Sequence, residues 1–163
     1  MTGVLLRIRR RPYVLLGFLG LSIVVFMLTY GVAFRRVSIG GSLTWQVVTG
    51  ALLVTGMIYQ WMLLIARRAG RPAEVRRHYA AHRWVGVGMT LVFAAHAVRF
   101  GHGWTSALAL CFIAIAATGL LNREVIPYRS RWIYNLWLWL HIALSSALVP
   151  LIGFHVWIAL TYQ

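Results

Sequence analysis

Five long apolar runs, separated by short segments that carry most of the charge, constrain this chain more than any other feature. The first run, residues 13–34, holds no charged side chain and has about the length that a helix needs to cross a bilayer. Backbone polar groups cannot stay unpaired in lipid, so such runs fold as helices. The pattern predicts an all-α fold, an integral membrane bundle of five transmembrane helices that forms a single domain over residues 1–163. The expected spans are residues 13–34, 43–66, 78–100, 104–121 and 132–161.

The composition favours the same membrane location. Hydrophobic residues make up 61% of the chain and charged residues 11%, which is the balance of a membrane protein and not of a soluble domain. A net charge of +14 also raises the question of nucleic-acid binding. The arginines, however, gather between the apolar runs, where they meet anionic lipid headgroups. We therefore expect membrane lipids as partners, no nucleic acid, and a location in a bacterial cytoplasmic (inner) membrane.

The distribution of arginine predicts the orientation of the helices. All the positive charge comes from sixteen arginines, because the chain has no lysine. With a cytoplasmic N-terminus, thirteen arginines fall on the inner side and only Arg35, Arg36 and Arg99 on the outer side. This is the bias of the positive-inside rule. Five spans then place the C-terminus outside, and the third and fifth spans run parallel to each other.

Two pairs of histidines share one spacing. His82 and His96 are fourteen positions apart in the third run, and His141 and His155 are fourteen positions apart in the fifth. Fourteen residues of α-helix make about four turns, so the members of a pair lie within about 40° of one face and about 21 Å apart. Ionisable residues inside a membrane are rare and mark functional sites. The pattern predicts two stacked haems, one between His82 and His141 and one between His96 and His155. The competing interpretation is a set of neutral, hydrogen-bonded histidines in a helix bundle.

Further residues complete the predicted cofactor site. Gly86 leaves room for a flat ring beside its helix, although small residues also serve plain helix packing in membranes. Arg83 for the inner haem and Arg99 for the outer haem are candidate partners of the anionic propionates, and headgroup anchoring is the alternative role for each. His78 lies one turn before His82 and replaces it as a ligand if the helix register is shifted. His102 is expected in the outer turn, as a solvated loop residue.

Cysteine usage limits the kind of haem. The single cysteine, Cys111, rules out an internal disulfide, and no C-x-x-C-H motif for covalent haem attachment is present. Any haem is therefore non-covalent and of the b type. Two histidine ligands fill both axial positions of the iron, which suits electron transfer better than oxygen chemistry.

The histidine pattern resembles that of the transmembrane dihaem cytochromes b. His-x13-His occurs twice, on two helices expected to be parallel, as in the cytochrome b core of quinol-oxidising bc complexes and in ferric-reductase-like transmembrane domains. The contexts His82-Arg-Trp-Val-Gly, Ala95-His96 and Leu140-His141-Ile are also similar to small bacterial flavinylation-associated cytochromes. The resemblance covers residues 78–160. It implies two b haems and electron transfer across the membrane.

Three functional hypotheses follow. The first is an electron-transfer subunit of a larger redox complex, with no catalytic residue of its own. Its donor would be quinol or an inner-side reductase, and its acceptor an outer-side flavoprotein or cytochrome. The second is a quinone-reactive membrane anchor of a dehydrogenase, with the same haems and a quinone as an additional cofactor. The third is a haem-free transporter or assembly subunit, which is disfavoured because the five spans contain no Asp, Glu or Lys for an ion relay.

The expected orientation is open to a direct test. A periplasm-active reporter, such as alkaline phosphatase, fused after Gln163 should be active, and a cytoplasm-active fluorescent reporter at the same position should be dark. The physical reason is that five spans carry the C-terminus to the side opposite the basic N-terminus. The reverse pair of signals would show that the number of spans is wrong.

Overall fold

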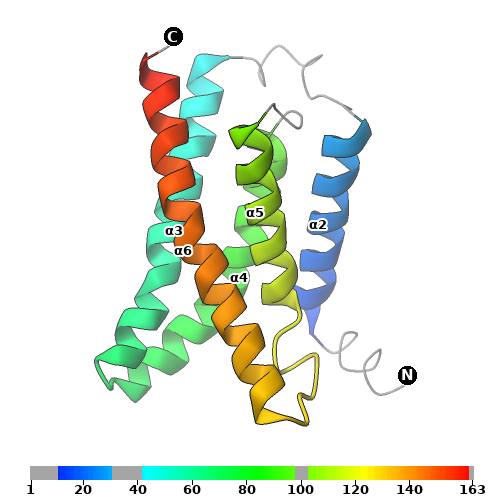
Figure 1. The fold of residues 1–163 in the computed structure, drawn as a ribbon, viewed down its shortest axis with the longest axis vertical. Coiled ribbons are helices and arrows are strands. Elements are labelled where there is room, and N and C mark those ends of the chain that lie inside the picture. Colours follow the sequence, from blue (N-terminus) through cyan, green and yellow to red (C-terminus); the bar gives the residue numbers. More distant parts are fainter. Residues whose placement is uncertain (1–10, 31–41, 98–102, 162–163) are drawn as a thin grey trace. The chain divides into compact units, whose positions relative to one another are not determined.

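The computed structural model describes residues 11–30, 42–97 and 103–161, and every regular element in these ranges is an α-helix. The prediction of an all-helical chain is confirmed for these residues. They form two compact units, one within residues 11–99 and the other within residues 100–163, and each unit is described by itself. The helices, labelled in Figure 1, are α2 (Pro12–Tyr30), α3 (Leu43–Arg68), α4 (Pro72–His96), α5 (Trp104–Leu120) and α6 (Arg131–Thr161).

Three of these helices, α2, α3 and α6, are long and apolar enough to cross a membrane. Helix α5 is apolar but has only 17 residues, and α4 carries several arginines in its first half. Large apolar side chains are exposed along the three long helices, for example Leu19 at 58%, Val47 at 58% and Leu136 at 53%. A soluble protein rarely exposes so much contiguous apolar surface. The helices therefore belong to a membrane protein.

In the first unit, α2 and α3 both pack against α4. The buried residues of α2 include Gly17, Gly20 and Val24, which recur every three or four positions and so form one face. A Cβ placed at Gly20 would lie 3.4 Å from the Thr90 side chain of α4, in ordinary contact. Small residues at this face let the two helices approach closely, as is usual for membrane helices.

The turn between α3 and α4 is short because its backbone chemistry ends one helix and begins the next. Gly70 has φ +65°, the left-handed conformation that glycine adopts without steric cost. The amides of Gly70 and Arg71 bond back to the carbonyls of Arg67 and Ala66, at 3.2 and 3.1 Å, which completes a Schellman cap. Pro72 follows at the first position of α4, where no amide hydrogen is needed. Helix α4 therefore begins at Pro72, six residues before the expected span of residues 78–100.

Helix α4 begins earlier and ends earlier than the expected span of residues 78–100. The prediction that the third helix reaches Phe100 is wrong within the described residues: α4 ends at His96, and Ala97 has φ −85° and ψ 102°, an extended backbone. Apolar residues continue past His96, so the hydrophobic pattern of the sequence gives no sign that the helix ends there. The first helix, expected to reach residue 34, is described to Tyr30, and residues 31–41 and 98–102 lie outside the described part.

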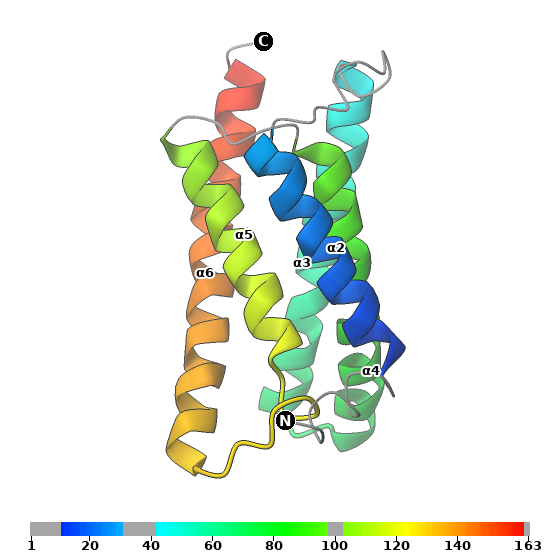
Figure 2. The same ribbon diagram turned by 90° about the vertical axis from the view of Figure 1, so that its right-hand side faces the viewer.

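The second unit is an antiparallel pair of helices, α5 and α6, joined by residues 121–130 (Figure 2). Helix α6 continues without interruption from Arg131 to Thr161, although Pro150 lies inside it. Proline lacks an amide hydrogen, so one intrahelical bond to Ser146 is lost. Because the helix is continuous, His141 and His155 share a single helix, as the sequence predicted.

The close approach of α3 and α4 gives a stability prediction. A Cβ at Gly56 would lie 2.9 Å from both Cγ and Sδ of Met89, whereas one at Gly88 would meet nothing within 4 Å. Gly56→Ala should therefore cost about 1–3 kcal/mol through overpacking, offset by a gain in helix propensity of about 1 kcal/mol.

We expect the thermal unfolding midpoint of Gly56→Ala in detergent to fall by about 2–4 °C. The midpoint of the matched control, Gly88→Ala, should stay the same or rise. Trimming the neighbour in a Gly56→Ala, Met89→Ala double variant should relieve the clash. Equal midpoints for the two single variants would mean that Met89 moves aside at no cost.

Candidate functional site

The four predicted ligands lie on two continuous helices, His82 and His96 on α4 and His141 and His155 on α6. Ideal helix geometry then puts each pair about 21 Å apart and close to one face. All four side chains are half-buried. Because α4 and α6 belong to different units, the joining of histidines across them stays a prediction.

His141 is held by a threonine of the neighbouring helix. Its Nδ1 lies 2.8 Å from Thr118 Oγ1 on α5. The next residue, Gly119, lets the ring lie against the α5 backbone, since a Cβ there would be 3.5 Å from His141 Cε1. The imidazole therefore has a fixed position between α5 and α6.

His96 has the same surroundings in the other unit. Its Nδ1 lies 2.9 Å from Thr49 Oγ1 on α3, and a Cβ at Gly50 would be only 3.3 Å from His96 Cε1. Both sites thus use a Thr-Gly dipeptide on the preceding helix. The dipeptide alone does not identify such a site, because Thr55-Gly56 also occurs on α3 and packs against Met89.

The threonine hydroxyls determine which nitrogen of each histidine carries the proton. Thr49 Oγ1 lies 2.7 Å from the carbonyl oxygen of Trp45, and Thr118 Oγ1 lies 2.9 Å from that of Ala114. Two oxygens this close need a hydrogen between them, and a hydroxyl has only one. The hydroxyl therefore donates to its own helix and accepts from the histidine Nδ1–H. Assigned in this way from the hydrogen-bond network, Nε2 of His96 and of His141 keeps its lone pair, as a metal ligand requires.

One tryptophan lies next to each of His141, His155 and His96. Trp137 stacks on His141, with ring centroids 6.0 Å apart and an interplanar angle of 14°, and its Nε1 donates to Thr118 O at 2.8 Å. Trp104 lies 5.2 Å from the His155 ring. Trp45 donates from Nε1 to Ala95 O at 3.0 Å, next to His96. Trp137 and Trp104 thus contact the rings of His141 and His155, and Trp45 bonds to the backbone beside His96.

Gln60 of α3 contacts the middle of α4 at His82. Gln60 Nε2 donates to the backbone carbonyl of His82 at 3.1 Å. A Cβ at Gly86 would lie 3.5 Å from the same Nε2, so Gly86 accommodates Gln60 in this structure. The role of Gly86 beside a cofactor stays a prediction. His78, the alternative ligand, packs against the ring of Tyr59 with centroids 5.7 Å apart.

Of the two arginines proposed as partners of the haem propionates, the structure describes Arg83. The guanidinium of Arg83 lies over two tyrosine rings, 4.8 Å from the centroid of Tyr13 and 4.9 Å from that of Tyr79. This sandwich ties α2 to α4 and keeps the charge near aromatic faces. Arg99 and His102 lie outside the described residues.

Within the described ranges, no three or more His, Cys, Asp or Glu side chains gather as they would around a structural zinc or calcium ion. A haem iron needs only two protein ligands, so the histidine pairs remain the candidate site. Sequence reasoning missed Thr49 and Thr118. The Thr-Gly dipeptides are visible in the sequence, but they do not identify the site, because Thr55-Gly56 has the same residues and contacts no histidine ring in the described structure.

The comparisons with known proteins add no family to this picture: no protein-family model, curated protein or solved structure matches the chain.

The threonine bonds predict a selective change in histidine tautomers. Thr118→Val keeps the side-chain shape but removes the acceptor of His141 Nδ1–H, and Thr49→Val does the same for His96. In haem-free protein with ¹⁵N-labelled histidine, each variant should shift one histidine from a single Nδ1–H tautomer towards a mixture, at a stability cost of about 1 kcal/mol.

Thr55→Val is the matched control, because Thr55 is exposed on the same helix as Thr49 and should leave all histidine signals unchanged. Unaltered spectra for both Thr49→Val and Thr118→Val would contradict the assigned tautomers.

Proposed function

We propose that this chain is a membrane cytochrome b that conducts electrons through two non-covalent b haems. Each haem would be held between one histidine of α4 and one of α6. The observation that carries the proposal is that two continuous helices each bear a histidine pair at the same fourteen-residue spacing. The threonine bonds support it, because they place the proton of His96 and His141 on Nδ1 and the lone pair on Nε2, the nitrogen that would bind iron.

The residues present fit such a cofactor. His82 with His141 would hold the inner haem and His96 with His155 the outer one, so each iron would receive one histidine that is fixed by a threonine. Bound between two histidines, the haem iron supplies one-electron redox chemistry and has no open axial position. The protein's part is to orient the imidazoles, exclude water with the apolar helices and set the protonated nitrogen at Nδ1. Arg83 and Arg99 are the proposed propionate partners.

The orientation follows the arginine distribution. We propose five spans, with the N-terminus in the bacterial cytoplasm and the C-terminus outside. In this topology α4 and α6 run in the same direction, so His82 and His141 lie near the inner side and His96 and His155 near the outer side. Electrons would then pass between an inner-side reductase or quinol and an outer-side flavoprotein or cytochrome, with the chain as one subunit of a larger complex.

The number and type of haems test the proposal. Protein produced in haem-sufficient cells should contain two acid-extractable b haems per chain and show the optical spectrum of six-coordinate, low-spin iron. The reason is that four histidines supply two complete axial pairs. Fully folded, stable protein without haem would refute the proposal.

Alanine variants of the four histidines test which residues share an iron. His96→Ala and His155→Ala should each lose the same haem, and the double variant should lose little more, because two ligands of one iron act as a unit. His82→Ala and His141→Ala should form the second matched set, and His78→Ala should keep both haems. A match between His96→Ala and His141→Ala would instead mean that α4 and α6 are not parallel.

A further inference from the structure

The segment between α5 and α6 forms a cationic pocket away from the histidine pairs. The pocket has a volume of about 490 Å³, within the usual size range of small-ligand sites. Its lining comes entirely from residues 123–135 and includes three arginines, Arg123, Arg129 and Arg131, together with the side chains of Ser130 and Asn135 and two tyrosines. No carboxylate lines it. All of these residues belong to one unit, so the pocket is complete within it.

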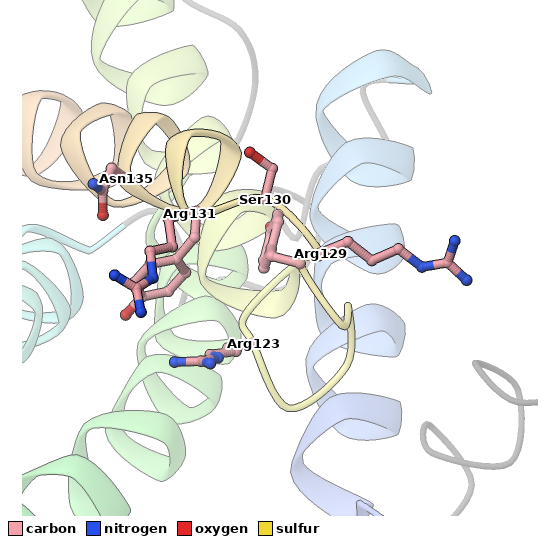
Figure 3. A pocket seen from close by; sticks show the side chains of 7 residues that line it. Arg123, Arg129, Ser130, Arg131 and Asn135 are labelled. Atoms are coloured by element: carbon pink, nitrogen blue, oxygen red, sulfur yellow. The ribbon is translucent and has the colours of Figure 1, made fainter.

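The polar groups of this pocket do not all point the same way. In Figure 3 the side chains of Arg123, Arg131 and Asn135 extend to one side of the loop, and that of Arg129 extends to the other. Two guanidinium groups and an amide therefore share one space. A guanidinium group donates several hydrogen bonds in a planar fork, and this geometry matches the oxygens of phosphate and of carboxylate.

The loop that carries these groups is held by its own hydrogen bonds. The Asn122 side chain donates to Gly119 O at 3.1 Å and accepts from the Glu124 amide at 2.9 Å. Its backbone carbonyl accepts from the amides of Val125 and Ile126, at 3.0 and 2.9 Å. The backbone on both sides of Arg123 is thus fixed before any ligand binds.

Two tyrosines position the pocket wall. Tyr128 donates its hydroxyl hydrogen to Leu121 O at 2.6 Å, and partial burial raises the pKa of Tyr128, so the side chain stays neutral beside an anion. The Arg123 guanidinium lies 5.4 Å from the ring centroid of Tyr134, which limits its freedom. These side chains therefore lose less conformational entropy when a ligand binds.

The described residues that line this pocket include no acidic side chain to balance its arginines. The chain has only two acidic residues. Glu74 pairs with Arg71 at 3.4 Å in the other unit, and Glu124 is not among the lining residues. Like charges placed together are unfavourable unless an anion joins them.

We propose that the pocket formed by Arg123, Arg131 and Asn135 binds a phosphate group, carried by an anionic phospholipid headgroup or present as free phosphate. The headgroup is the source that the surroundings favour. Trp132 is 70% exposed and Trp139 is 69% exposed, on the same first turns of α6, and exposed tryptophans of membrane helices lie at the headgroup level. The start of α6 also presents the positive end of a helix dipole to the pocket. The site does not depend on the presence of haem.

Two arms of one experiment distinguish the sources. Detergent-purified protein is mixed with equimolar phosphatidylglycerol and phosphatidylcholine, and retained lipid is counted by native mass spectrometry. In the second arm, inorganic phosphate is titrated at constant ionic strength by calorimetry. Preferential retention of one phosphatidylglycerol assigns the site to a headgroup, and saturable binding of phosphate that displaces this lipid assigns it to phosphate in general. Saturable binding in neither arm would overturn the proposal.

Three variants that each remove one positive charge test whether binding depends on the pocket. Arg123→Gln and Arg131→Gln should each weaken binding about tenfold, because each removes charge-assisted hydrogen bonds. Arg129 is also among the lining residues, but its guanidinium extends to the other side of the loop (Figure 3). Arg129→Gln removes the same charge from the same loop and should weaken binding less than about threefold. Circular dichroism confirms that all three fold alike. An equal loss in the three variants would show diffuse attraction by the loop charge and would overturn the pocket.

Discussion

The pairing of polar groups inside an apolar bundle is the constraint on which this structure depends. In lipid, a hydroxyl, an indole N–H or an amide must find its partner within the protein. Several side chains meet this need by bonding to neighbouring carbonyls, such as Gln60 Nε2 to His82 O, Trp137 to Thr118 O and Ser145 to His141 O. The bonds of Gln60 and Trp137 also join neighbouring helices, whereas that of Ser145 lies within α6. The positions of the histidines follow from them.

The sequence predicted the helices better than the contacts between them. Apolar runs are a local property, and they indicated that α3 and α4 are helices, although α4 begins and ends earlier than the expected span. The end of α4 at His96 was missed because the apolar run continues past the point where the backbone changes. The predicted number of spans rests on the apolar runs, and the predicted orientation rests on the arginine pattern.

The threonines that hold His96 and His141 could not be predicted from spacing. Whether Thr49 faces a histidine depends on how α3 is rotated and how closely it approaches α4, and Thr55, one and a half turns later on the same helix, faces outward. The same applies to the pocket at residues 123–135, whose arginines look like ordinary headgroup anchors in the sequence. Only the fold of the loop brings Arg123 beside Arg131 and directs Arg129 away (Figure 3).

The end of α4 at His96 gives that histidine an electrostatic environment that His141 lacks. The last carbonyls of a helix have no amide partner in the helix, and together they carry a partial negative charge of about half an elementary unit. His96 lies at this end, whereas His141 lies well inside α6, with complete turns on both sides. A cation bound at His96 is therefore stabilised by the backbone itself. Two histidines with the same threonine contact thus differ in the backbone charge that surrounds them.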